Sequence, residues 1–402
     1  MASPALSSQA PEVPGDHQAK TAAGLRIALY SGNYNSVRDG ANKALNRLVA
    51  HLLARGAAVR VYAPAHPDHM FDAPGDVVEV PSVPIPTRSE YRVTYGLSKA
   101  VREDIKAFRP NVMHVSVPDF TARQAQKLAR KMGIPVVGSL HTLFETYLDY
   151  YGFGFARPWG ERYLARFYSR CDLVLVPSAV LGDVVRRTSG VPTAIWSRGV
   201  DRTFFDPARR DEAWRQAHGF GPDEVAVAFF GRLVLEKGTA IFAEIVSELR
   251  RRGHRVVPLV IGEGPERERL AGALGEAVFT GHVEADELAR AVASADIMVN
   301  PSVTEAFGNV NLEAMAAGLA VVAADVPVVR TMIEPGLSGF LADPASAGDF
   351  ADQIERLLAD PALRRTFGTN AREAAERYDW DAILDSVVAS YRSLVKGIAA
   401  DG

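Results

Sequence analysis

Short runs of apolar residues alternate, along most of the chain, with longer segments in which apolar side chains recur every three or four positions. The run at 25–30 has the length and composition of a buried strand. In the segment 41–55 the apolar residues fall at the spacing of one helix face, and a second apolar run occupies 59–63. This order predicts a parallel strand pair, because parallel neighbours need a long crossover connection. The polar loop 31–40 should therefore lie at the carboxyl edge of the sheet, where ligands bind.

The alternation occurs in two halves, which are separated by a linker-like segment at 198–207. Each half contains enough elements for a doubly wound α/β domain with its own core, and two such domains leave a cleft between the carboxyl edges of their sheets. Further strands are expected at 77–80, 112–115, 135–139, 173–176, 193–197, 225–230, 256–261, 277–280, 295–299, 320–323 and 339–342. Further helices are expected at 88–108, 119–132, 157–170, 238–252, 265–273, 285–294, 309–317, 327–333 and 346–376.

These patterns divide the chain into four parts. Residues 1–24 are rich in Pro, Ser, Ala and Gln and lack the apolar core of a signal peptide, so we expect a disordered tail. Residues 25–198 and 199–378 are expected to form the two domains. Residues 379–402 begin with an amphipathic helix pattern, for which Asp379 is a suitable N-cap.

Composition narrows the class of protein. The 402 residues are 48% hydrophobic and 23% charged, as in an ordinary globular protein, and the net charge of −3 gives no reason to expect nucleic acid as a partner. Cys171 is the one cysteine, which excludes an internal disulfide and suits a reducing, cytoplasmic location. It lies next to an apolar run, so we expect a buried structural thiol. No apolar stretch approaches the roughly 18 residues of a membrane span.

The segment 301–318 contains the first candidate chemistry. An apolar run precedes a loop with Glu305 and Gly308, and a helix pattern follows with Asn309 as the expected N-cap. A strand, a glycine loop and a helix start predict an anion site at the sheet edge. On one helix, Glu305 and Glu313 would lie about 12 Å apart, too far for the roughly 5 Å of a retaining glycosidase pair. Glu313 could contact an elongated ligand or be a solvated first-turn glutamate, and this segment alone leaves both interpretations open.

Two glycine turns of the second half offer further candidates. Between the strand at 225–230 and the next helix, Gly231, Arg232 and Lys237 place a turn, a guanidinium and an ammonium at a helix entrance, which suits a diphosphate. A pair of solvated surface cations is the alternative. Gly262 and Gly264 form a tight turn after the following strand, without the complete dinucleotide fingerprint that would indicate NAD.

Together these motifs resemble glycosyltransferase family 4, whose members are retaining enzymes of the GT-B fold. The matching features are Glu305-x7-Glu313 with Phe307-Gly308, the Gly-Arg-Leu-x-x-x-Lys-Gly segment, the Gly-x-Gly-Pro turn, His141-Thr, Thr-Gly-His282-Val283 and Arg198-Gly-Val-Asp. The resemblance implies that Glu305 and His141 lie beside the donor sugar, Glu313 binds the ribose, and Arg232 and Lys237 stabilise the diphosphate. It also implies a donor and nucleotide site that includes Gly231, Gly262, Gly264, His282, Val283, Phe307, Gly308 and Asn309.

The acceptor side departs from the family pattern. Where the family has two adjacent glycines, this chain has Arg38, Asp39 and Gly40 in a loop that begins near Gly32. This departure leaves the acceptor open.

The resemblance implies a retaining, metal-independent hexosyltransferase that uses a UDP-sugar or GDP-mannose and no cofactor. It is nearest to lipid mannosyl-, glucosyl- and sulfoquinovosyl transferases, so the implied acceptor is a hydroxyl of a membrane lipid or glycan precursor. It further implies that the final helix crosses back to the first domain. A sugar-nucleotide epimerase, a phosphorylase and a non-catalytic sugar-nucleotide-binding protein are the alternatives.

Three remaining segments each have a structural and a functional interpretation. Asp379-Trp-Asp381 matches the metal motif of the other main glycosyltransferase fold, but its place at a helix start favours capping. The segment 157–170 mixes cations with aromatic residues, and 88–109 adds more Lys and Arg. These residues could dock on an anionic membrane or form a solvated face beside a core-facing stripe.

Overall fold

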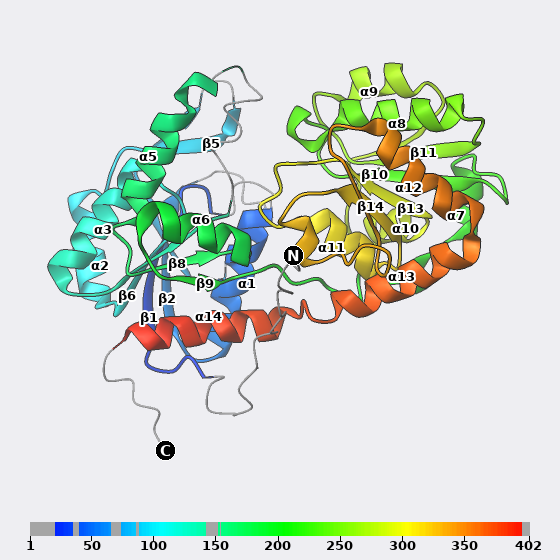
Figure 1. The fold of residues 1–402 in the computed structure, drawn as a ribbon. Helices are drawn as coiled ribbons and strands as arrows, with labels where there is room; N and C mark the ends of the chain where they lie inside the picture. Colours follow the sequence, from blue (N-terminus) through cyan, green and yellow to red (C-terminus); the bar gives the residue numbers. More distant parts are fainter. Residues whose placement is uncertain are drawn as a thin grey trace, which may run out of the picture.

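The computed structural model describes residues 21–34, 40–65, 74–85, 88–141, 152 and 154–395. It contains two parallel sheets, each covered by helices on both faces (Figure 1). Because both faces are covered, the strands read as nearly continuous apolar runs. Residues 1–20 of the tail expected at 1–24 lie outside the described residues, as do the loop residues Arg38 and Asp39.

The first sheet has seven parallel strands in the order β3-β2-β1-β6-β7-β8-β9. Its strands are β1 (Arg26–Tyr30), β2 (Ala58–Pro64), β3 (Asp76–Val80), β6 (Val112–Val115), β7 (Val136–Ser139), β8 (Leu173–Val176) and β9 (Thr193–Ile195). The helices of this domain are α1 (Gly40–Ala54), α2 (Lys99–Phe108), α3 (Phe120–Met132), α5 (Arg157–Tyr168) and α6 (Ala179–Ser189), with a short 3-10 turn η2 (Gly154–Ala156) before α5.

The second sheet has six parallel strands in the order β12-β11-β10-β13-β14-β15. Its strands are β10 (Val225–Phe230), β11 (Val256–Ile261), β12 (Val278–Gly281), β13 (Ile297–Asn300), β14 (Ala320–Ala324) and β15 (Phe340–Ala342). The helices of this domain are α7 (Glu212–Ala217), α8 (Thr239–Arg251), α9 (Arg267–Leu274), α10 (Ala285–Ala293), α11 (Asn309–Ala316), α12 (Ala347–Ala359) and α13 (Pro361–Ala375), with 3-10 turns η3 (Pro207–Arg209), η4 (Leu235–Lys237) and η5 (Val329–Thr331).

The last helix, α14 (Trp380–Leu394), returns to the first domain (Figure 1). Its buried side chains Leu384, Val387, Val388 and Tyr391 join the apolar cluster that β1 and α1 form. Asp379 accepts a hydrogen bond from the backbone N–H of Ala382 at 2.9 Å, so this aspartate is the N-cap that the sequence predicted.

The two chain crossings between the domains lie side by side. The backbone N–H of Val200 donates to the carbonyl of Tyr378 at 3.0 Å. A Cβ on Gly199 would lie 2.6 Å from the ring of Trp380. The first crossing is therefore packed directly against the second.

Several expected elements are wrong or missing. Residues 88–108 are not one helix: β5 (Arg88–Thr94) pairs antiparallel with β4 (Ser82–Ile85), and α2 begins only after its cap Ser98. The expected helix 346–376 is two helices, because Asp360-Pro361 ends one and starts the next. The expected helix 327–333 is only the turn η5, and the sequence analysis missed α6 and α7.

Cys171 is buried, as expected, and accepts from the amide of Gln126 at 3.4 Å. Burial raises the pKa of its thiol to about 12, so it stays protonated and unreactive at neutral pH. None of the helices in the described part of the chain is both long and apolar enough to cross a membrane.

Candidate functional site

The loops that follow β10 and β11 interlock at the carboxyl edge of the second sheet. A Cβ on Gly262 would lie 1.9 Å from the carbonyl oxygen of Gly231, and a Cβ on Gly264 would lie 2.3 Å from that of Leu233. The backbone N–H of Leu233 donates to the carbonyl of Glu263 at 2.9 Å. Only glycine fits at 262 and 264, so the Gly-x-Gly turn fixes the loop that carries Arg232.

Arg232 and Lys237 lie on this loop in different electrostatic settings. The side chain of Arg232 is 56% exposed, and its Nη2 lies 4.0 Å from the buried carboxylate of Glu236. Lys237, at the end of η4, donates to Oε1 of Glu305 at 2.7 Å, with the two side chains 23% and 7% exposed. The structure therefore brings Lys237 and Glu305 together, although 68 residues separate them in the chain.

The loop that carries Glu305 is anchored to the same backbone. The hydroxyls of Ser302 and Thr304 both donate to the carbonyl of Glu236, at 3.2 and 3.1 Å. A Cβ on Gly238 would lie 3.1 Å from the carbonyl oxygen of Pro301. The segments 236–238 and 301–305 thus form one rigid unit that fixes the Lys237–Glu305 pair.

The N-terminus of α11 faces the N-terminus of α1 in the other domain. Gly308, with a φ of +99°, is the N-cap, so the expectation that Asn309 caps the helix is wrong. Asn309 is instead the first helical residue, and its Nδ2 lies 2.7 Å from where a Cβ on Gly40 would be. Two positive helix ends converge here, which favours a negatively charged ligand.

Glu313 is not a solvated glutamate. Its side chain is partly buried on α11, and loss of hydration raises the pKa of the carboxyl to about 7, although Lys43 on α1 acts to lower it. A carboxyl with this pKa is partly protonated at neutral pH. The partial burial excludes a fully solvated side chain, and ligand binding by Glu313 stays a prediction.

His141 lies at the end of β7 and belongs to a chain of hydrogen bonds. Nη2 of Arg198 donates to Nδ1 of His141 at 2.8 Å, so the ring proton is on Nε2, which donates to Oγ of Ser139 at 2.8 Å. Ser139 contacts Nε2 of His114 at 2.9 Å, and Nδ1 of His114 contacts the hydroxyl of Tyr391 at 2.8 Å. Burial and the nearby Arg198 hold the pKa of His141 well below its usual value, so the ring is neutral.

The loop after Glu305 also reaches the first domain. Ala306 packs against the apolar cluster that contains Leu140, the residue before His141. The Glu305 loop therefore packs against the core of the first domain.

The other expected site residues have no direct contact with the Lys237–Glu305 pair among the described interactions. His282 is exposed and contacts Glu284 at 2.9 Å, whereas Val283 and Phe307 pack in the core of the second domain. Gly32 lies against Val117, where a Cβ would be 3.1 Å from the valine side chain.

Sequence reasoning missed five residues that shape this site: Glu236, Lys43, Arg198 as the partner of His141, His114 and Tyr391. A histidine inside the buried run 112–115 was a usable signal, because a buried polar side chain needs a partner. The partner itself, Tyr391, is 277 residues away and could not be identified from a local pattern.

Comparison with known proteins identifies the family of this chain. Residues 38–204 match the family model described as Glycosyltransferase Family 4, and residues 210–374 match Glycosyl transferases group 1. A sulfoquinovosyl transferase from Arabidopsis thaliana is 34% identical over 76% of this chain and 61% of that protein. A GDP-mannose-dependent alpha-mannosyltransferase from Mycolicibacterium smegmatis is 28% identical over 92% of this chain and 98% of that protein.

Among solved structures, a sucrose-phosphate synthase from Thermosynechococcus elongatus matches with a TM-score of 0.73 and 23% identity. The match covers 92% of this chain and 99% of that chain, and it shows that the two proteins share a fold. The chain is therefore a member of the family 4 glycosyltransferases and has the GT-B fold.

Proposed function

We propose that this enzyme transfers a hexose from a nucleotide-diphosphate sugar to an acceptor hydroxyl with retention of configuration at the anomeric carbon. The observation that carries this proposal is the partly buried Lys237–Glu305 pair on the rigid loop unit beside the start of α11. It places an ammonium, a carboxylate and a positive helix end within one small region, as the reacting end of such a donor requires.

The charge on the donor changes during the reaction. As the bond between the sugar C1 and the phosphate oxygen breaks, negative charge builds on the diphosphate. Arg232, Lys237 and the N-terminus of α11 stabilise this charge where it develops. Glu305 holds Lys237 in place and positions the sugar, while Glu313 accepts hydrogen bonds from the ribose hydroxyls.

In this proposal both carboxylates of the donor site already have partners. Glu305 pairs with Lys237, and Glu313 contacts the ribose of the donor. We therefore favour attack on the face that the diphosphate leaves. The acceptor oxygen forms the new bond to C1, and its proton passes to the departing phosphate oxygen. His141, whose ring is neutral and engaged on both nitrogens, orients the sugar rather than exchanging a proton.

We propose a UDP-hexose or GDP-mannose as the donor and a membrane lipid or glycan precursor as the acceptor, because relatives of this chain are a GDP-mannose-dependent mannosyltransferase and a sulfoquinovosyl transferase. The protein cations meet the charge on the diphosphate, so we further propose that neither a metal ion nor another cofactor is required. The enzyme would act in the cytoplasm, at the inner face of the cell membrane.

The test is release of nucleoside diphosphate by purified protein. A thermal-shift screen of UDP-, GDP- and ADP-sugars selects the donor, and release is then measured with and without lipid extract as acceptor, in the presence and absence of EDTA. Acceptor-dependent release and an α-linked product are expected, and EDTA should have no effect. An interconverted sugar nucleotide would indicate an epimerase, phosphate-dependent release a phosphorylase, and binding without turnover a non-catalytic protein.

A further inference from the structure

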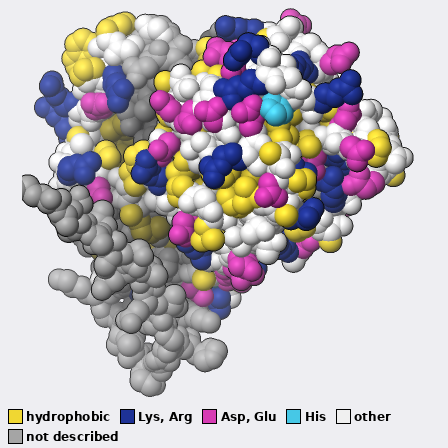
Figure 2. Space-filling model, turned by 45° about the vertical axis from the view of Figure 1, so that its right-hand side comes forward, with side chains coloured by type: hydrophobic (Ala, Val, Ile, Leu, Met, Phe, Trp, Pro, Cys, Tyr) yellow, Lys and Arg dark blue, Asp and Glu magenta, His cyan; other side chains and the backbone are white. Residues whose placement is uncertain are grey.

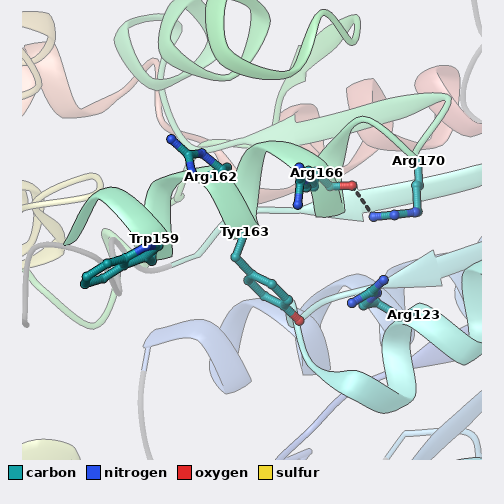
Figure 3. Close-up of a pocket in the computed structure, with 6 residues that line it drawn as sticks. All are labelled: Arg123, Trp159, Arg162, Tyr163, Arg166 and Arg170. Atoms are coloured by element: carbon teal, nitrogen blue, oxygen red, sulfur yellow. Dashed lines mark hydrogen bonds between the residues drawn. The ribbon is translucent and has the colours of Figure 1, made fainter. Parts of the chain in front are cut away.

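Four arginines and two aromatic residues line a hollow between α5 and the start of α3. The hollow has a volume of about 380 Å³ and is lined by Arg123, Trp159, Arg162, Tyr163, Arg166 and Arg170. Figure 3 shows Tyr163 extending from α5 toward Arg123 on α3, with Trp159, Arg162 and Arg166 along α5 and Arg170 beyond its end. We call this set the arginine pocket.

The cations of the arginine pocket are not neutralised by the described part of the chain. None of these four arginines forms an ion pair with a described carboxylate, although Arg157 on the same helix pairs with Glu161 at 2.9 Å. Elsewhere the protein intersperses its charges: basic and acidic side chains alternate over the face of the second domain in Figure 2. Four arginines without a described carboxylate partner line one hollow, so a multivalent anion would bind there favourably.

Tyr163 fixes the geometry of the arginine pocket. Its hydroxyl donates to the carbonyl of Pro118 at 2.7 Å and thereby ties α5 to the segment before α3. Partial burial raises the pKa of this hydroxyl, Asp119 also acts to raise it, and Arg123 and Arg170 act to lower it. The hollow is therefore held by a bond between two elements.

Exposed aromatic rings lie on or next to α5 and α3, the helices that contribute most of the arginine pocket. Phe155 in η2 and Trp159 in α5 are 71% and 64% exposed, and Phe120 at the start of α3 is 61% exposed. Phe155, Trp159 and Tyr163 recur every four residues and so follow one face of the η2–α5 segment. Exposed aromatic rings next to arginines are typical of surfaces at the boundary between lipid headgroups and acyl chains.

The arginine pocket borders the acceptor side of the cleft. Pro118, which accepts the bond from Tyr163, lies between Val117 and Asp119. Both of these residues contact the position that a Cβ on Gly32 would occupy, at 3.1 and 3.4 Å. A surface bound at the arginine pocket would therefore lie next to the loop where the acceptor enters.

We propose that the arginine pocket binds the phosphate headgroup of an anionic membrane lipid, with Phe155, Trp159 and Phe120 inserted among the neighbouring lipids. The role of this site in catalysis rests on the proposed function, because it presents the acceptor loop at Gly32 to the bilayer that holds the acceptor.

The test is binding of the full chain to vesicles of phosphatidylcholine alone, or of phosphatidylcholine mixed with phosphatidylinositol or phosphatidic acid. Wild-type protein should bind only the anionic vesicles. The Arg162→Gln/Arg166→Gln double variant should bind them about thirtyfold more weakly, as expected for two cations near an anionic surface. Trp159→Ala should also weaken vesicle binding. The control is Lys131→Gln/Arg187→Gln, which removes the same charge from exposed positions of the same domain and should change binding little.

Circular dichroism and thermal unfolding verify that each variant is folded. Equal vesicle binding by the double variant and the control would overturn the proposal, as would equal binding of neutral and anionic vesicles. If soluble inorganic pyrophosphate stabilises the protein against thermal unfolding but no vesicle binding is seen, the site binds a free phosphate compound. That result would also overturn the proposal. Donor binding by wild-type protein, from the thermal-shift screen, reports on the proposed function separately: its absence beside intact vesicle binding would remove the transferase proposal alone.

Discussion

The two regions richest in cations, the donor loops of the second domain and the arginine pocket of the first, are built in opposite ways. Lys237 is largely buried and paired with Glu305, and its loop is locked by glycine contacts and by the hydroxyls of Ser302 and Thr304. The four arginines of the pocket have no carboxylate partner in the described chain. The donor loops are preorganised for a ligand whose charged groups have fixed positions. The arginine pocket instead suits an anionic surface whose geometry can vary.

The largest effect should follow from removing the paired cation. Lys237→Ala should lower the transfer rate at least about a hundredfold, since it deletes one stabiliser of the developing diphosphate charge. Lys99→Ala is the matched control, because Lys99 is an exposed lysine of the first domain. Release of nucleoside diphosphate at saturating donor is the measurement, and a normal rate in Lys237→Ala would contradict the role given to this residue.

The rigidity of the donor loops can be tested at Gly262. Gly262→Ala should destabilise the protein by about 2 kcal/mol, because the new methyl group would meet the Gly231 carbonyl at a φ of +143°. Urea unfolding measures the change. Gly272→Ala serves as the control, since nothing lies within 4 Å of its added methyl group. If both variants are equally stable, the interlocked turns are not rigid.

Titration of Glu313 provides a pH signature of the donor side. Its pKa of about 7 means that the carboxylate form, the better acceptor for ribose hydroxyls, becomes dominant as the pH rises through 7. Nucleotide affinity should therefore rise up to about tenfold between roughly pH 6 and 8. The raised pKa also makes the free energy of unfolding depend on pH. The stabilisation from this group is fully present below the ordinary carboxyl pKa and is lost as the pH rises through 7.

Calorimetric titration with the nucleoside diphosphate at several pH values measures this dependence, and Glu313→Gln should flatten it. A slope that persists in Glu313→Gln would assign the titration to another group. Binding of wild-type protein to phosphatidylinositol vesicles should show no such rise, because neither the arginines nor the phosphodiester headgroup titrates in this range.

The smallest effect is expected at the far end of the hydrogen-bond chain. Tyr391→Phe should cost about 1 kcal/mol of stability, since it leaves Nδ1 of buried His114 without its partner. It should also lower kcat/KM severalfold, because His141 is held through Ser139 by the same chain. Tyr95→Phe, at an exposed position, is the control for both measurements. Unchanged stability together with unchanged kcat/KM would show that the chain does not support His141.

Sequence patterns predicted the elements whose conformation depends mainly on neighbouring residues in the chain. The strand, glycine loop and helix at 297–316 could be read from the sequence because an apolar run, Gly308 and a helix pattern occur in succession. The segment 88–94 could not, because its strand state depends on pairing with β4. The tie between Arg198 and His141 likewise depends on the folded sheet, as does the burial of Glu236.

The return of α14 to the first domain bears on how this protein is made. Synthesis completes residues 25–198 long before α14 leaves the ribosome, yet four side chains of α14 belong to the apolar cluster of β1 and α1. The domain that is translated first therefore keeps an apolar strip uncovered until α14 has been synthesised. A nascent chain stalled before residue 380 would expose that strip to chaperones, although the second domain would already hold every strand of its sheet.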